Sequence, residues 1–189
     1  MTKGKCTVKI GIIVGSIRQG RKAEGVAQWV AQGVAGRDGV EAELLDLAVF
    51  KLPMFDAPKP PMMLKRQYDS EAVRAWSQAV DSCDGFIFVL PEYNRSIPAV
   101  LKNAVDWLAP EWMDKNAACV SYGSVGGARA VEHLRHVLAN FNMHVIRPQV
   151  MLSLFTDFAD NSVVSNERQQ KDLKSLVDDL VAAVARQQG

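Results

Sequence analysis

The chain has 189 residues, of which 48% are hydrophobic and 23% are charged, and its formal net charge is +1. This size and composition fit one compact domain and exclude a disordered or fibrous protein. A net charge near zero offers no field for nucleic acid or for an anionic membrane, so an anionic ligand must be held by a local cluster of charges.

The start of the chain, MTKGKCTVKI, moves into a strand pattern without a long apolar signal region. No later apolar run approaches the roughly 18 residues of a membrane span. We therefore expect a soluble cytoplasmic protein with no membrane partner. The three cysteines, Cys6, Cys83 and Cys119, are odd in number and widely spaced, which predicts reduced packing residues and no disulfide framework.

Apolar runs of strand length alternate with segments of helical periodicity along the whole chain. Strands are expected at 7–14, 40–47, 85–90, 117–122 and 144–152, and helices at 22–36, 70–83, from about 98 to 108, 127–141 and 165–186. Near-continuous apolar runs such as TVKIGIIV are typical of strands buried on both faces. Ser70 suits an N-cap and Pro98 a first helical turn, whereas Pro148 interrupts the last strand.

This alternation predicts a single α/β domain over residues 1–189, a three-layer sandwich with helices on both faces of a five-stranded parallel sheet. The flavodoxin-like strand order 2-1-3-4-5 is the leading candidate, with ligands bound outside the carboxyl ends of the strands. The loops at 15–21, 91–97 and 123–129 should then converge. The long Pro-rich loop at 48–68 covers one edge of the site or a partner subunit, or is a plain connection.

The first loop, GSIRQGR, suggests an anion site that suits a phosphate monoester. Glycine frees the backbone at Gly20, Ser16 offers a hydroxyl, and Arg18 and Arg21 offer charged forks ahead of a helix N-terminus. The alternative is a solvated basic turn. The loop departs from the P-loop pattern GxxxxGK[ST], because arginine replaces the lysine and Lys22 replaces the hydroxyl residue.

A dinucleotide-binding site is a weaker alternative for the same region. The chain has no GxGxxG motif, although Asp46 ends the second strand about where a ribose-binding acid would sit.

The second and third loops suggest a surface for a planar heterocycle, although a purely structural turn would also account for the second. The PEYN segment would lay its peptide edges and the Tyr93 ring along the heterocycle. Asn94 would hold either the loop or a ring edge. The role of Glu92 is ambiguous, because a buried carboxylate needs a partner. The third loop combines glycines that allow close backbone approach with hydroxyl side chains: Gly123, Gly126, Gly127, Ser121, Tyr122 and Ser124.

The sequence resembles the NADPH-dependent FMN reductases of the flavodoxin-like superfamily, a group that includes bacterial quinone and chromate reductases. The resemblance rests on GSIRQGR at 15–21, PEYNRSIPAVLKNAVDWL at 91–108 and SYGSVGGARAVEHLR at 121–135. It implies an FMN phosphate near Ser16, Arg18 and Arg21. It also implies ring contacts from Pro91, Glu92, Tyr93 and Asn94, and pyrimidine-edge contacts from Ser121, Gly123, Ser124, Gly126 and Gly127. Many members carry serine where this chain has Arg21.

The family's mechanism implies hydride transfer from NADPH or NADH to bound FMN, and then to quinones, free flavins or other small acceptors including chromate, with ping-pong kinetics. Because the flavin carries this chemistry, no catalytic side chain is assigned. The basic residues Lys59, Lys65 and Arg66 favour NADPH. The resemblance also implies a homodimer or homotetramer, with Trp107 and Trp112 at an interface, although both indoles would also suit the protein interior.

Two alternatives belong to other functional classes. A flavodoxin-like electron carrier would bind FMN without reacting with NAD(P)H, and a non-flavin nucleotide-binding domain would bind no FMN. No metal site is expected, because His133 and His136 lack an evident third ligand. The positions of Arg129 and Arg135 suit either the helix surface or a subunit contact.

Overall fold

The computed structural model describes residues 7–188. Its main sheet has five strands in the order β2-β1-β3-β4-β5, and every neighbouring pair is parallel. The predicted strand order is therefore confirmed. The strands are β1 (Val8–Val14), β2 (Val40–Asp46), β3 (Gly85–Pro91), β4 (Asn116–Gly123) and β5 (His144–Ser153).

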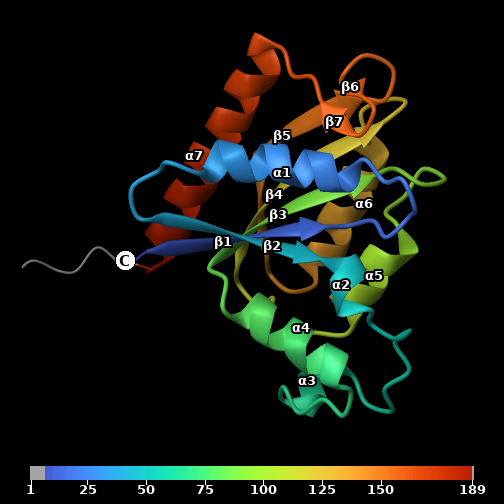
Figure 1. Cartoon of the computed structure of the whole chain (residues 1–189). Coiled ribbons are helices and arrows are strands. Elements are labelled where there is room, and N and C mark those ends of the chain that lie inside the picture. The colour runs from blue at the N-terminus through green and yellow to red at the C-terminus, as the bar shows by residue number, and fades with distance from the viewer. Residues whose placement is uncertain (1–6, 189) are drawn as a thin grey trace, which may run out of the picture.

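Helices cover both faces of this sheet (Figure 1), with α1 and α7 on one side and α4, α5 and α6 on the other. Each predicted helix is present, and the long loop also contains the one-turn helices α2 and α3. The helices are α1 (Ala23–Val34), α2 (Leu47–Phe50), α3 (Pro61–Leu64), α4 (Glu71–Asp81), α5 (Ala99–Asp106), α6 (Ala128–Ala139) and α7 (Glu167–Gln188). None of the helices within residues 7–188 combines the length and the apolar character needed to cross a membrane.

The strands supply side chains alternately to two hydrophobic cores. In β3, Phe86 and Phe88 pack with α4, α5 and α6, whereas Ile87 and Val89 pack with α1 and α7. All seven residues of β3 are buried. Burial on both faces explains why this strand reads as a continuous apolar run.

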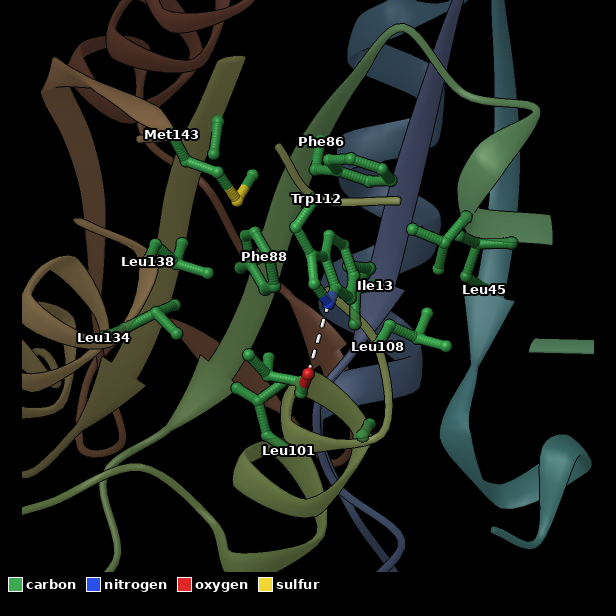
Figure 2. Close-up of a cluster of buried hydrophobic side chains, with 14 of the residues drawn as sticks. Ile13, Leu45, Phe86, Phe88, Leu101, Leu108, Trp112, Leu134, Leu138 and Met143 are labelled. Atoms are coloured by element: carbon green, nitrogen blue, oxygen red, sulfur yellow. Dashed lines mark hydrogen bonds between the residues drawn. The ribbon is translucent and has the colours of Figure 1, made fainter. Parts of the chain in front are cut away.

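Trp107 and Trp112 lie inside the first core, so the expected interface role for them is wrong. The Trp112 ring is fully buried, its centroid lies 5.1 Å from that of Phe86, and its indole N–H donates to the Val105 carbonyl at 3.2 Å. Figure 2 shows this ring at the centre of the cluster. Trp107 is 6% exposed and its indole N–H donates to the Pro53 carbonyl at 2.7 Å. Because both polar N–H groups have partners within the chain, both rings can be buried.

The proline in the last strand is accommodated by a register shift. Ala117 pairs with Val145, but Cys119 pairs with Gln149, so β5 bulges around Pro148. Proline lacks the N–H that a regular ladder needs, and an edge strand with a bulge tolerates it. The predicted strand is therefore confirmed.

A small antiparallel hairpin was not predicted. It consists of β6 (Phe158–Ala159) and β7 (Ser162–Val163), and it packs against the start of α1. A side chain at Gly25 would overlap the Asn161 carbonyl. The hairpin therefore lies directly beside the loop that follows β1.

Two helix starts differ slightly from expectation. Ser70 occupies the N-cap position of α4 but its side chain makes no capping hydrogen bond, and Pro98 precedes α5 at the N-cap position.

Candidate functional site

Three loops converge at the carboxyl ends of β1, β3 and β4 and enclose a pocket of about 380 Å³. The convergence follows from the strand order, because β3 lies between β1 and β4. The pocket is lined by Arg18, Gly20, Arg21, Lys22, Pro91, Glu92, Tyr93, Tyr122, Gly123 and Leu154.

The loop after β1 is held close to β3 before it turns into α1. The Gly15 N–H donates to the Val89 carbonyl at 2.8 Å, and a side chain at Gly15 would crowd that same carbonyl. Gly20 has φ +66°, which favours glycine. The first turn of α1 carries no side-chain cap. The N-cap residue, Lys22, lines the pocket, so the positive end of this helix dipole lies beside the pocket.

The Arg21 guanidinium is engaged within the protein. It donates to both oxygens of Asp46, at 2.8 and 2.5 Å, and to the Ser16 carbonyl at 2.6 Å. The hydrogen bonds that Arg21 donates to the Asp46 carboxylate raise the pKa of Arg21. Asp46 also accepts from the Ala48 N–H at 2.9 Å and so caps α2. The acid considered for a ribose contact is therefore paired with Arg21.

Ser16 and Tyr93 connect the first loop to the second. Ser16 is fully buried, and its hydroxyl lies 2.9 Å from the Tyr93 hydroxyl. Arg18 is exposed at the pocket and pairs with no carboxylate among residues 7–188. Arg18 is thus the arginine of this loop whose charge is available to a ligand.

The PEYN loop is a tight turn at the end of β3. Tyr93 and Ser96 exchange backbone hydrogen bonds at 2.9 and 3.0 Å. The two residues between them, Asn94 and Arg95, have φ +48° and +68°, as a type I′ turn requires. Asparagine tolerates this conformation better than most residues. Asn94 is exposed, so its position in the turn accounts for it without a ring contact.

Glu92 joins the second loop to the third through Arg129. Its side chain is 7% exposed, and its carboxylate accepts from the Arg129 N–H at 3.2 Å and from the Arg129 guanidinium at 2.7 Å. Burial alone would raise the pKa of Glu92, but the hydrogen bonds and charge of Arg129 outweigh it and lower that pKa. Arg129 therefore links the second loop to the first turn of α6 beside the pocket.

The third loop folds back on itself through its own backbone. The Ser121 hydroxyl donates to the Gly126 carbonyl at 2.6 Å, and the Gly123 carbonyl accepts from Gly126 and Leu154 N–H groups. Gly127 has φ +77°, and a Cβ there would lie 2.9 Å from Ser121 Cβ. Ser121 is fully buried and Ser124 is exposed. Ser121 thus stabilises the loop, and of the six residues named for this loop Tyr122 and Gly123 line the pocket.

Sequence reasoning missed the pocket wall formed by Leu154 and the role of Lys22. The Lys22 ammonium donates to the Asp160 carbonyl and lies 4.8 Å from the centroid of the Phe158 ring. Strands of two residues give no periodic signal, so the hairpin that holds Lys22 was not visible in the sequence. Tyr122, noted only for its hydroxyl, is 5% exposed and packs edge-on against Phe158.

The two histidines lie on the surface of α6, where the Nδ1 atom of His133 is 2.9 Å from the Ser96 hydroxyl. Across residues 7–188, no group of three His, Cys, Asp or Glu side chains is arranged to hold a metal ion. Arg135 donates to the carbonyls of Val145 and Ile146 and so links α6 to β5.

Comparisons with known proteins agree with this geometry. The family model described as NADPH-dependent FMN reductase matches residues 8–157. An NAD(P)H-dependent FMN reductase of Schizosaccharomyces pombe is 38% identical over 160 residues, which cover 85% of this chain and 80% of the relative. An NAD(P)H:quinone oxidoreductase of Solanum tuberosum is 29% identical over 191 residues, which cover 96% and 95% of the two chains.

Among solved structures, the flavoenzyme FerB, an NAD(P)H:(acceptor) oxidoreductase from Paracoccus denitrificans, superposes with a TM-score of 0.75 at 25% identity. The match covers 95% of this chain and 98% of FerB. A flavodoxin from the domain Archaea has a TM-score of 0.61 at 12% identity over 94% and 98% of the chains, a likeness of fold alone. On the family match and these identities, the chain belongs to the NADPH-dependent FMN reductase family.

Proposed function

We propose that the protein binds FMN in the pocket at the carboxyl edge of the sheet and uses NAD(P)H to reduce quinones, free flavins and other small acceptors. Membership of the family brings FMN as cofactor and NAD(P)H as electron donor. The observation that carries the proposal is the meeting of a basic loop, the PEYN turn and a glycine loop around one pocket.

The residues around this pocket fit the two ends of FMN. The exposed Arg18 and the uncapped N-terminus of α1 suit a phosphate, because both favour negative charge. Gly127 leaves no room for a side chain against Ser121 and Tyr122, which fixes the path of the third loop beside the pocket. The proposed cofactor-binding set is Ser16, Arg18, Gly20, Arg21, Pro91, Glu92, Tyr93, Asn94, Ser121, Gly123, Ser124, Gly126 and Gly127.

Members of this set would contribute in different ways. Arg18 would bind the phosphate through its guanidinium, and Tyr93 and Pro91 would border the ring system. Ser16, Ser121 and Asn94 would act through the shape of the loops. When bound, FMN supplies the two-electron redox chemistry, and the protein supplies orientation and a polar environment.

We assign no side-chain acid, base or nucleophile. Glu92 is the carboxylate of the pocket, and its contacts with Arg129 lower its pKa. It therefore stays ionised near neutral pH and holds no proton to donate. Its contribution is to fix the loops around the ring.

The proposed kinetic scheme is ping-pong, with donor and acceptor using the same place in turn. The loops around the pocket also carry exposed apolar side chains, including Ile17, Val125 and Phe155. These apolar side chains support the proposal that the acceptors are planar organic molecules. We extend the range to chromate on the resemblance to bacterial quinone and chromate reductases, and we favour NADPH over NADH on the basic residues of the long loop.

We also propose a homodimer or homotetramer in the cytoplasm. The segment from Val49 to Met63 exposes apolar side chains, with Met54 73% and Met63 64% exposed, which supports a subunit contact there. Light scattering on the purified protein tests the oligomer. Cys83 and Cys119 are free and buried, which supports a reducing compartment, and Cys6 lies outside the described residues.

An anaerobic stopped-flow experiment tests the activity. The FMN-loaded protein is mixed with NADPH and, separately, with NADH, and the oxidised-flavin absorbance near about 450 nm is followed. Rapid bleaching by either donor supports the reductase and shows its preference. Bleaching only in the presence of a separate reductase would support the electron carrier instead, and failure to load FMN would overturn both.

A further inference from the structure

We propose that Arg21 and Asp46 form a brace that sets the shape of the phosphate-binding loop, and that Arg21 is a positioning residue which does not contact the phosphate. The inference rests on the proposed FMN site. It separates the two arginines of the loop: Arg18 binds the ligand, and Arg21 holds the loop that presents Arg18.

The contacts of Arg21 face the interior of the loop. Its side chain is 13% exposed, and its fork spans the Ser16 carbonyl on one loop and both carboxylate oxygens of Asp46 on the neighbouring strand end. The Arg21 N–H also donates to the Arg18 carbonyl at 3.1 Å, which closes the turn between them. Arg21 thus links Ser16 near the start of the loop, Arg18 in its middle and the end of β2.

A phosphate contact made end-on through Nη1 and Nη2, the two atoms that hold Asp46, would cost these interactions. Bidentate arginine–carboxylate pairs are among the stronger hydrogen-bonded contacts in proteins, and turning the guanidinium to the pocket would break this pair and the bond to Ser16. It would also leave Asp46, whose side chain is 22% exposed, unpaired beside a phosphate of the same sign. Neutralising Asp46 is therefore part of what Arg21 does.

The partner is itself fixed in position. Asp46 ends β2, caps α2 through the Ala48 N–H and pairs with Arg21. Glu24, the other acid near Arg21, lies 3.9 Å away and is 62% exposed, so it contributes little. The brace thus connects the phosphate-binding loop to the start of the long segment after β2.

FMN affinity measured with five variants of the full chain separates a brace from a ligand. Flavin fluorescence quenching gives the FMN dissociation constant for the wild type, Arg18→Ala, Arg21→Ala, Arg21→Lys, Asp46→Asn and the Arg21→Ala/Asp46→Asn double variant. Riboflavin, which lacks the phosphate, is titrated in parallel. Arg168→Ala, which removes an 89% exposed arginine on α7, is the charge control, and thermal unfolding of each apo-protein reports folding.

A brace predicts that Arg21→Ala, Arg21→Lys and Asp46→Asn each weaken FMN binding about tenfold, because each breaks the fork. The double variant should lose no more FMN affinity than either single variant. Riboflavin affinity should change less than about twofold, as should the FMN affinity of Arg168→Ala. Apo-protein melting temperatures should fall together for the three single variants, whereas Arg18→Ala should weaken FMN binding without lowering the melting temperature.

Tighter FMN binding by Asp46→Asn would overturn the inference, because releasing a phosphate ligand from its competitor strengthens binding. Near-normal affinity in Arg21→Lys, where one charge remains without the fork, would overturn it too. Additive losses of FMN affinity in the double variant would also overturn the inference. If the wild type binds no FMN, the proposed function itself has failed, which is a distinct result from any of these.

Discussion

The carboxylate of Glu92 accepts hydrogen bonds from both the backbone and the side chain of Arg129, across the gap between the PEYN turn and the first turn of α6. The same carboxylate therefore caps a helix that belongs to the next loop. Because these two loops border one pocket, their relative position depends on this pair.

Glu92→Gln removes the negative charge that pairs with Arg129. It should therefore lower the free energy of unfolding by about 1 kcal/mol and weaken FMN binding. We expect less than the roughly 3–5 kcal/mol of a fully buried pair, since the Arg129 side chain is 37% exposed. Urea denaturation and FMN titration measure the two effects. Glu132→Gln, on an exposed pair of the same helix at 3.9 Å, should change neither, and equal losses in both variants would contradict this role for Glu92.

The contribution of Glu92 should depend on pH. Its pKa in the folded protein lies below the ordinary value of 4.5, so the pair stabilises the fold fully above that value and progressively less as the pH falls through the lowered pKa. The difference in unfolding free energy between the wild type and Glu92→Gln should be constant from about pH 8 to about 6 and shrink in acid. A difference that grows below pH 4.5 would contradict the lowered pKa.

The sheet could be predicted from sequence because strands buried on both faces leave a plain signal. Every residue of GFIFVLP in β3 is buried, and the alternation with helical stripes leaves few topologies once crossovers are right-handed. Convergence of the three loops followed from strand order alone. Arg18 and Tyr93, on two of those loops, line the pocket as the strand order predicts.

What sequence reasoning could not reach depends on pairs distant in the chain. Arg21 and Asp46 are 25 residues apart and Glu92 and Arg129 are 37 apart, and no local pattern connects them. Leu154 follows β5 as an ordinary apolar residue, and it joins the pocket because its N–H bonds to Gly123. Trp112 lies after a helix ends, where periodicity no longer indicates which way a side chain points.

Trp112→Ala should lower the free energy of unfolding by about 3–5 kcal/mol, and Trp112→Phe by about 1–2 kcal/mol. The ring is fully buried beside Phe86 and Phe88 (Figure 2) and also contacts Trp76, so alanine leaves a cavity that its neighbours fill only in part. Phenylalanine keeps most of the volume but loses the hydrogen bond to Val105. Urea denaturation of the apo-protein measures both.

Trp29→Phe is the matched control, because Trp29 is only partly buried. The loss of unfolding free energy in Trp29→Phe should stay below about 1 kcal/mol. A similar loss for the two phenylalanine variants would mean that Trp112 is not central to the core.

Gly127→Ala should destabilise the protein and weaken FMN binding, for two separable reasons. Gly127 has φ +77°, which disfavours any side chain, and its Cβ would lie 2.9 Å from Ser121 Cβ and 3.1 Å from the backbone of Tyr122. Gly36 has a similar φ of +80° with nothing within 4 Å of its Cβ. Gly36→Ala should therefore show the backbone strain alone, about 1 kcal/mol.

Gly127→Ala should lose at least about 1 kcal/mol more unfolding free energy than Gly36→Ala. This difference measures the steric contact with β4. Only Gly127→Ala should weaken FMN binding, since displacing Ser121 or Tyr122 moves the loop that borders the pocket. Urea denaturation with and without FMN distinguishes the two effects. Equal losses in the two variants, with FMN affinity unchanged, would mean that the third loop adapts to a side chain and that its glycines serve the turn alone.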